Sequence, residues 1–167
     1  APASFGAVCH GPVITDTAAA AFSGCIARTN NTAELSAVPQ MLARACRYQR
    51  DKRDSARRRR RPPPPPLTLI FCYDSQYTHD TCVADAASPL PRRNRTIVAL
   101  CRRLLADAAQ LGIAVAWVKV RGHSTTNPAD MTVVGNNRAD KAADRGQEGK
   151  TCGEIEIAKY MRRELGR

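Results

Sequence analysis

The strongest constraint on the fold of this chain is the apolar run Leu67–Tyr73, "LTLIFCY", which lies between five prolines and Asp74-Ser75. Its length and its β-branched and aromatic residues suit a strand, and it lacks the apolar–polar alternation of a strand with one wet face. The run therefore predicts a central strand buried on both faces. Such a strand needs other strands beside it and helices to cover it.

The rest of the chain contains patterns that supply those elements. Up to residue 146 the order of the patterns is β-β-α-β-α-α-β-α, with one further helical pattern after it, which predicts an α/β fold with a mixed sheet covered by helices. Pro39 falls inside the first helical pattern, where it is compatible with a kinked helix or with an early break. The remaining predicted strands are residues 5–9, 18–27 (joined to the first by a hairpin) and 113–120; the predicted helices are residues 31–45, 75–87, 95–111, 137–146 and 154–165.

Residues 49–66, "QRDKRDSARRRRRPPPPP", form a low-complexity tract. Its like charges repel one another and its prolines favour an extended polyproline conformation. We expect an insertion that is mobile unless a partner orders it. The chain as a whole, residues 1–167, is predicted to be one domain with this Arg/Pro-rich insertion and a C-terminal helical extension at residues 147–167.

Charge and cysteine usage indicate the class of partner and the compartment. The formal net charge is +11, which favours a polyanionic partner and nucleic acid first. The seven cysteines show no zinc-ligand spacing and suit small buried hydrophobes in a reducing environment, so we expect an intracellular protein, whether nuclear, cytoplasmic or mitochondrial. Apolar runs all fall short of a membrane span, so we expect a soluble chain with no membrane partner.

Three carboxylates stand where a ligand site forms in α/β proteins. Glu34 lies one turn into the first predicted helix, Asp74 ends the buried strand, and Asp140 opens a late helix. Converging carboxylates would bind hard divalent cations, Mg²⁺ or Mn²⁺, which activate water for phosphate chemistry. Each also has a structural alternative: Glu34 favoured by the helix dipole, Asp74 as a helix cap, and Asp140 as a solvated helix residue.

Taken in order, "TNNTAEL", "CYDSQYT", "VKVRGHS" and "GNNRADKAAD" resemble the motifs of the type 1 ribonuclease H domain. The resemblance extends from about Phe5 to Asp144. It implies a ribonuclease H-like mixed β-sheet flanked by helices. It also implies an endonuclease that hydrolyses the RNA strand of RNA–DNA hybrids by two-metal catalysis with Mg²⁺ or Mn²⁺.

The resemblance assigns roles to particular residues of this chain. Its catalytic, metal-binding carboxylates are Glu34, Asp74 and Asp140, and His123 matches the loop histidine that assists proton transfer or product departure. The residues matching minor-groove contacts to the hybrid are Thr29, Asn30, Asn31 and Gln76. Short amide and hydroxyl side chains suit this role, because only RNA offers a 2′-hydroxyl.

One departure from the family pattern leaves alternatives open. The family's first catalytic aspartate lies on a strand before "FGAV", where this sequence has only Ala1–Ser4. We expect that strand upstream of Ala1, as in a larger retroelement-type polypeptide, or on a neighbouring chain. The alternative is a nuclease-dead relative that binds structured RNA within a ribonucleoprotein such as an organellar ribosome. A DNA-processing relative fits less well, because Asn30, Asn31 and Gln76 favour recognition of an RNA strand.

Overall fold

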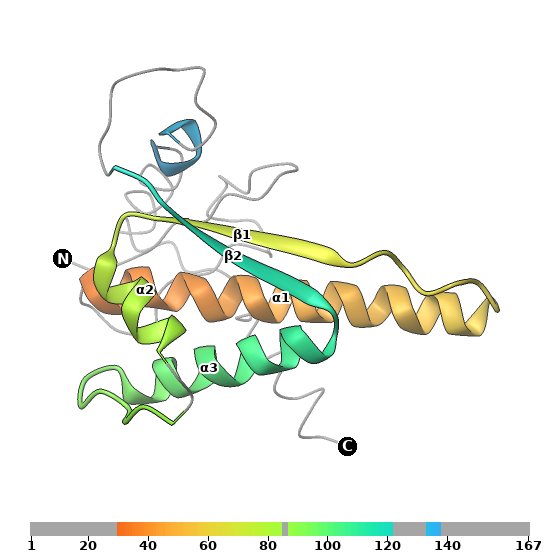
Figure 1. Ribbon diagram of the computed structural model, residues 1–167, viewed down its shortest axis with the longest axis horizontal. Helices are drawn as coiled ribbons and strands as arrows, with labels where there is room; N and C mark the ends of the chain where they lie inside the picture. The colour runs from red at the N-terminus through yellow and green to blue at the C-terminus, as the bar shows by residue number, and fades with distance from the viewer. Residues whose placement is uncertain (1–29, 85–86, 122–132, 138–167) are drawn as a thin grey trace, which may run out of the picture.

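A computed structural model describes residues 30–84, 87–121 and 133–137 (Figure 1). The order of the elements in these residues agrees with the predicted α-β-α-α-β succession. The hairpin predicted within residues 5–27, the helix predicted over residues 154–165, and residues 138–146 of the helix predicted over 137–146 lie outside the described residues, whereas residues 133–137 are helical. The elements are α1 (Asn30–Arg58), β1 (Leu67–Tyr73), α2 (Gln76–Val83), α3 (Arg95–Gln110) and β2 (Ile113–Lys119).

Helix α1 is 29 residues long and passes through Pro39 without ending. A proline inside a helix removes one hydrogen bond and costs about 3 kcal/mol in an exposed position. Here the ring is completely buried, on the same side of the helix as Leu35 and Leu42. The burial of this ring offsets the lost hydrogen bond. The helix therefore continues through Pro39, and the early break that the sequence left open does not occur.

Helix α1 also continues past residue 45, where the helical pattern was predicted to end, and reaches Arg58. Arginine and alanine are good helix formers, and Arg57 and Arg58 place positive charge at the negative end of the helix dipole. The first part of the Arg/Pro-rich tract is therefore helical. Residues 61–66 form the irregular connection to β1. The division of the chain into domain, insertion and extension stays a prediction.

Strands β1 and β2 run parallel and are paired from Leu67 with Ile113 to Tyr73 with Lys119. The backbone N–H of Val120 donates to the carbonyl oxygen of Tyr73 at 2.8 Å, which extends the pairing by one step. Parallel neighbours need a crossover connection, and α2 and α3 provide it. Gly112, with φ of 66°, ends α3 as predicted and turns the chain into β2.

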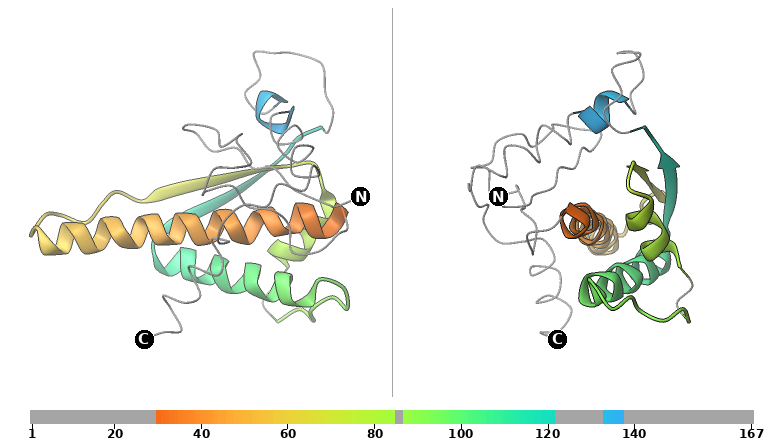
Figure 2. Two further views of the ribbon diagram at one scale, coloured as in Figure 1. Left: turned by 180° about the vertical axis from the view of Figure 1, so that it is seen from behind. Right: turned by 90° about the vertical axis from the view of Figure 1, so that its left-hand side faces the viewer.

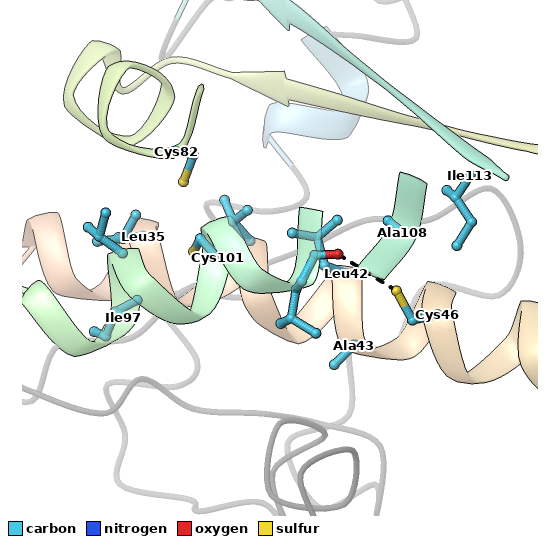
Figure 3. Close-up of a cluster of buried hydrophobic side chains, with 12 residues drawn as sticks. Leu35, Leu42, Ala43, Cys46, Cys82, Ile97, Cys101, Ala108 and Ile113 are labelled. Atoms are coloured by element: carbon cyan, nitrogen blue, oxygen red, sulfur yellow. Dashed lines mark hydrogen bonds between the residues drawn. The ribbon is translucent and has the colours of Figure 1, made fainter. Parts of the chain in front are cut away.

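The hydrophobic core lies between the strands and the two long helices (Figure 3). The end-on view in Figure 2 shows α1 and α3 on one side of the two strands. Leu69, Phe71 and Trp117 point from the sheet into this layer. The fully packed residues of the core are Leu35, Val38, Leu42, Ala43, Cys46, Cys82, Ile97, Val98, Cys101, Leu104, Ala108 and Ile113. The predicted α/β class is confirmed.

The prediction that β1 is buried on both faces is wrong. Its side chains alternate between half-buried and exposed, and Ile70 keeps 57% of its surface exposed. Helices α1 and α3 cover the face that carries Leu69 and Phe71, whereas Thr68, Ile70 and Cys72 lie on the other face. Apolar composition alone did not distinguish the two faces, because apolar residues occur on both.

Cysteines fill the core as small hydrophobic residues. Cys46, Cys82 and Cys101 are buried free thiols, as their sequence context predicted, whereas Cys72 is exposed. Burial raises the pKa of the Cys46 thiol to about 11, and its Sγ donates to the carbonyl oxygen of Leu104 at 3.9 Å. The pKa of Cys101 is raised by its hydrogen bond with Cys82 and by burial. The thiols of Cys46 and Cys101 therefore stay protonated at neutral pH.

Candidate active site

The carboxyl ends of both strands lie at one edge of the sheet, because the strands are parallel. Asp74 follows β1 directly, and Lys119 ends β2 beside Tyr73. Helix α2 begins at Gln76 at the same edge, and it contacts α1, whose N-terminal end lies at this end of the molecule (Figure 1). Ligand sites in open α/β sheets form at this edge.

Asp74 is exposed and is not the N-cap of α2. Ser75 takes that position: its backbone is extended, and its Oγ accepts a hydrogen bond from the backbone N–H of Thr78 at 3.3 Å. A serine side chain thus satisfies one of the first free N–H groups of the helix. The structural alternative for Asp74, a capping role, is removed, and its carboxylate remains accessible from solvent.

Glu34 is also exposed, and it lies beyond the first turn of α1, which contains no acidic residue. The dipole of a helix acts on charges within the first turn and weakens beyond it. The helix dipole therefore does not explain why a carboxylate occurs at position 34. Asn30 and Asn31 begin the same helix, and Asn31 is exposed.

Gln76 is held by hydrogen bonds at both ends of its amide. Lys119 Nζ donates to Gln76 Oε1 at 2.7 Å, and Gln76 Nε2 donates to Asp80 Oδ1 at 2.7 Å. His79 Nδ1 lies 2.9 Å from the same Asp80 oxygen. This chain of four side chains, the Gln76 network, connects the end of β2 to the first turns of α2. These bonds fix the orientation of the Gln76 amide, with its oxygen turned toward Lys119 and its nitrogen toward Asp80.

An aromatic cluster packs beside the Gln76 network. The His79 ring stacks on Tyr73 with the centroids 4.5 Å apart and 11° between the planes. Trp117 meets the His79 ring edge-on at 5.6 Å and stacks on Phe71 at 4.7 Å. These contacts join β1, β2 and α2 and restrict the position of His79. The aromatic layer therefore supports the polar residues at the sheet edge.

The hydrogen bond from His79 lowers the pKa of the Asp80 carboxyl group, and the bond from Gln76 lowers it further. Both donors favour the charged form of the carboxylate. Asp80 is therefore ionised at neutral pH and acts as an acceptor in the Gln76 network. Because Asp80 is exposed, this effect changes its titration more than the stability of the fold.

Sequence reasoning identified Gln76 but missed Lys119, Asp80 and His79. The spacing of Gln76 and Asp80, four residues apart on a helix, is a signal that could have found one of these contacts. The contact of Lys119 with Gln76 joins residues 43 positions apart and depends on the pairing of the two strands. No local pattern predicts it.

Three of the predicted site residues, Thr29, His123 and Asp140, lie outside the described residues. In residues 30–84, 87–121 and 133–137, no three His, Cys, Asp or Glu side chains gather closely enough to hold a metal ion. Glu34 and Asp74 supply the oxygen donors that suit Mg²⁺, but two carboxylates are fewer than the predicted set of three. The assigned roles of all the site residues stay predictions.

Comparison with models of protein families identifies the family of this chain. The family model of RNase H matches residues 2–148, most of the chain. The chain belongs to the ribonuclease H family. Ribonucleases H bind RNA–DNA hybrids and generally use divalent metal ions, and the two parallel strands flanked by helices agree with their fold. No individual curated protein and no solved structure gives a significant match. Within the described part of this chain, no helix has the length and apolar character to cross a membrane.

Proposed function

We propose that this chain hydrolyses the RNA strand of RNA–DNA hybrids endonucleolytically by two-metal catalysis with Mg²⁺ or Mn²⁺. The observation that carries the proposal is the position of Asp74. It is an exposed carboxylate at the carboxyl edge of parallel strands, released from capping by Ser75, in a chain that matches the RNase H family. Glu34 supports it as a second exposed carboxylate on the helix whose N-terminal end lies at this edge.

The donor set suits the proposed metal ions. Glu34, Asp74 and Asp140 offer only oxygen ligands, which Mg²⁺ and Mn²⁺ prefer. Bound there, the ions would supply an activated water and neutralise the developing charge on the leaving phosphate oxygen. His123 follows β2 by four residues in the sequence and would assist proton transfer, a role that suits the near-neutral titration of histidine.

We assign recognition of the RNA strand to amide and hydroxyl side chains that lie close to Glu34 and Asp74 in the sequence. In this proposal Thr29, Asn30, Asn31 and Gln76 bond to groups in the minor groove, where RNA presents its 2′-hydroxyls. Gln76 is exposed and pre-oriented by Lys119 and Asp80. A side chain held in one orientation loses less entropy when it binds than a free one does. The Gln76 network therefore supports specific contact with an RNA strand.

The test is hydrolysis of a labelled RNA–DNA hybrid by the full-length protein with Mg²⁺ or Mn²⁺. Replacing Asp74→Asn removes one negative charge without changing size, and we expect it to reduce cleavage at least about 100-fold, the scale of removing one electrostatic interaction from a catalytic site. Asp51→Asn is the matched control, because Asp51 is also exposed and lies on α1 about 17 residues beyond Glu34, roughly 26 Å along the helix. Cleavage that survives Asp74→Asn at the control's rate would rule out the proposed site.

The alternative, a nuclease-dead relative that binds structured RNA in a ribonucleoprotein, is favoured by one observation, the concentration of exposed arginine at the end of α1. The same assay distinguishes it. Binding of hybrid or structured RNA by the full-length protein without cleavage, with either metal ion, would replace the enzymatic proposal by this one. Cleavage would exclude it. A larger parent polypeptide and an intracellular location remain part of the enzymatic proposal.

A further inference from the structure

The C-terminal part of α1 extends beyond the core. Gln49 is the last buried residue of the helix, and Arg58 lies about 14 Å further along it at about 1.5 Å per residue. Figure 1 shows this end of α1 projecting past the strands and past α3. The view from behind in Figure 2 shows the same projection. Packing against the core does not require this extension, because its side chains from residue 51 onward are exposed or half-buried.

The extension carries most of the excess positive charge of the protein. We call residues 52–61 the basic arm. It contains seven Lys and Arg residues and one acidic residue, Asp54, so its formal charge is +6 out of +11 for the whole chain. All seven basic side chains are exposed: Lys52, Arg53, Arg57, Arg58, Arg59, Arg60 and Arg61.

The basic arm ends in a defined turn rather than in a frayed helix. Arg61 N donates to Ala56 O at 2.9 Å, and Arg60 N donates to Arg57 O at 3.2 Å. Together with the left-handed backbone of Arg60, φ 51°, these bonds form a Schellman motif. The proline run then returns along the helix, where Gln49 Nε2 donates to Pro65 O at 3.4 Å. The arginines are thus held on a fixed support.

Like charges four positions apart on a helix, such as Arg53 and Arg57, repel one another. A row of guanidinium groups on a fixed support suits regularly spaced anions, and each guanidinium can bind a phosphate through two N–H groups. The RNase H family binds RNA–DNA hybrids, whose backbones supply such phosphates. The charge of the arm is therefore complementary to the family's own ligand.

The basic arm is far from the candidate active site. Glu34 and Arg58 are about 24 residues apart on one continuous helix, a separation of about 36 Å. At about 3.4 Å per base pair, this corresponds to roughly 11 base pairs of duplex. A duplex shorter than this separation cannot contact both places at once, whereas a longer one can.

We propose that the basic arm is a second nucleic-acid binding surface, which binds the phosphate backbone of a hybrid at a distance from the active site and without regard to sequence. The inference rests on the proposed function for the identity of the duplex. The arm would add affinity and hold the protein on long hybrids, and it would take no part in hydrolysis.

The test compares two lengths of hybrid, about 8 and about 24 base pairs, by fluorescence anisotropy with the full-length protein in EDTA. The arm variant combines Arg57→Gln, Arg58→Gln and Arg59→Gln, which keep helix propensity and leave Arg60 in its turn. The control variant combines Arg92→Gln, Arg93→Gln and Arg95→Gln, which removes three exposed charges from another surface. Circular dichroism and thermal melting establish that both variants fold.

We expect the arm variant to lose about tenfold or more in affinity for the 24-base-pair hybrid and less than about twofold for the 8-base-pair hybrid. The slope of log K against log salt on the longer hybrid should fall by about 2 to 3, near 0.9 for each phosphate that the arm no longer neutralises. The control should show no such difference between lengths. Equal losses of affinity for both lengths of hybrid would overturn the proposal. Unchanged affinity for the longer hybrid would also overturn it, and is the result expected if the arm binds an acidic protein instead.

Cleavage by the same proteins separates this inference from the proposed function. With Mg²⁺, the arm variant should cleave the 8-base-pair hybrid at the wild-type rate, because that duplex is about 27 Å long and residues 57–59 lie about 35 Å or more from Glu34 along α1. If the wild-type protein cleaves neither hybrid but shows the length-dependent binding, the enzymatic proposal fails and the arm stands. If it cleaves both and the arm variant binds like wild type, the arm proposal fails alone.

Discussion

Lys119 Nζ donates a 2.7 Å hydrogen bond to Gln76 Oε1, across 43 residues of sequence. The bond sets the orientation of the Gln76 amide, because the oxygen faces Lys119 and the nitrogen is left to donate to Asp80. The end of β2 thereby controls a side chain on α2 that the family resemblance places against the RNA strand. Lys119 is on this reasoning a positioning residue for Gln76.

Replacing Lys119→Met should weaken binding of an RNA–DNA hybrid by about threefold to tenfold, the scale of one hydrogen bond, by releasing the Gln76 amide. The effect should disappear when Gln76 is already alanine, so a double-mutant cycle on hybrid affinity should give a coupling of about 0.5–1.5 kcal/mol. If Lys119 instead bound a phosphate itself, its removal would cost the same in both backgrounds and would reduce the salt slope by about 1.

The Asp80 carboxyl group should titrate below the usual range for aspartate, because His79 and Gln76 donate to its charged form. Its pKa is lower in the folded state, so its small contribution to stability is present above the usual aspartate pKa and is lost as pH falls through the lowered value. His79→Phe keeps a ring against Tyr73 and removes the donor. A ¹³C NMR titration of the carboxyl carbon should show an upward shift of the Asp80 pKa in that variant; an unchanged titration would contradict the assignment of His79 as the main donor.

Thiol labelling should distinguish the exposed cysteine from the buried ones. At pH 8, iodoacetamide should modify Cys72 in the folded protein and leave Cys46, Cys82 and Cys101 intact. Burial and the raised pKa of Cys46 both keep it in the unreactive thiol form. Peptide mapping by mass spectrometry checks the result, and labelling in denaturant is the positive control. Rapid modification of Cys46 in the native protein would be inconsistent with the packing of α1 on α3.

Core and surface positions should differ sharply in their effect on stability. Leu104 is completely buried between α1 and α3, and Leu104→Ala should reduce the free energy of unfolding by about 2–5 kcal/mol. Ile70 is 57% exposed on β1, so Ile70→Thr, which keeps a β-branched side chain, should cost less than about 1 kcal/mol. Urea denaturation followed by circular dichroism measures both. A large decrease in stability at position 70 would show that the outer face of β1 is covered in solution.

The left-handed backbone of Arg60 offers a stabilising substitution. A non-glycine residue in this conformation costs roughly 1–2 kcal/mol, and glycine relieves that cost at the end of a helix. Arg60→Gly should therefore raise the free energy of unfolding by about 0.5–1 kcal/mol, after its greater freedom in the unfolded chain is subtracted. Arg57→Gly, inside the last helical turn, should lower it by a similar amount. Urea denaturation again compares the two, and destabilisation by both would argue against the Schellman turn.

Local patterns predicted much of the fold. The stripe on residues 95–111 predicted α3, Gly112 predicted its end, and the β-rich "IAVAWVKV" predicted β2. These predictions succeeded because each depends on residues that are close in sequence. The end of α1 and the burial of β1 were predicted wrongly, since low complexity was taken to exclude helix in the arginine tract, and apolar content does not reveal how many faces of a strand are covered.

The sequence by itself determined the family and the elements, because motif order, periodicity and turn residues are written along the chain. Only the tertiary structure decided that Ser75 rather than Asp74 caps α2, that Lys119 holds Gln76, and that the arginines stand on a projecting helix. The physical reason is that these features depend on the path of the backbone, on hydrogen bonds between distant residues and on where the core ends. The contact of Lys119 with Gln76 and the projection of the arginines in particular are not set by any short stretch of sequence.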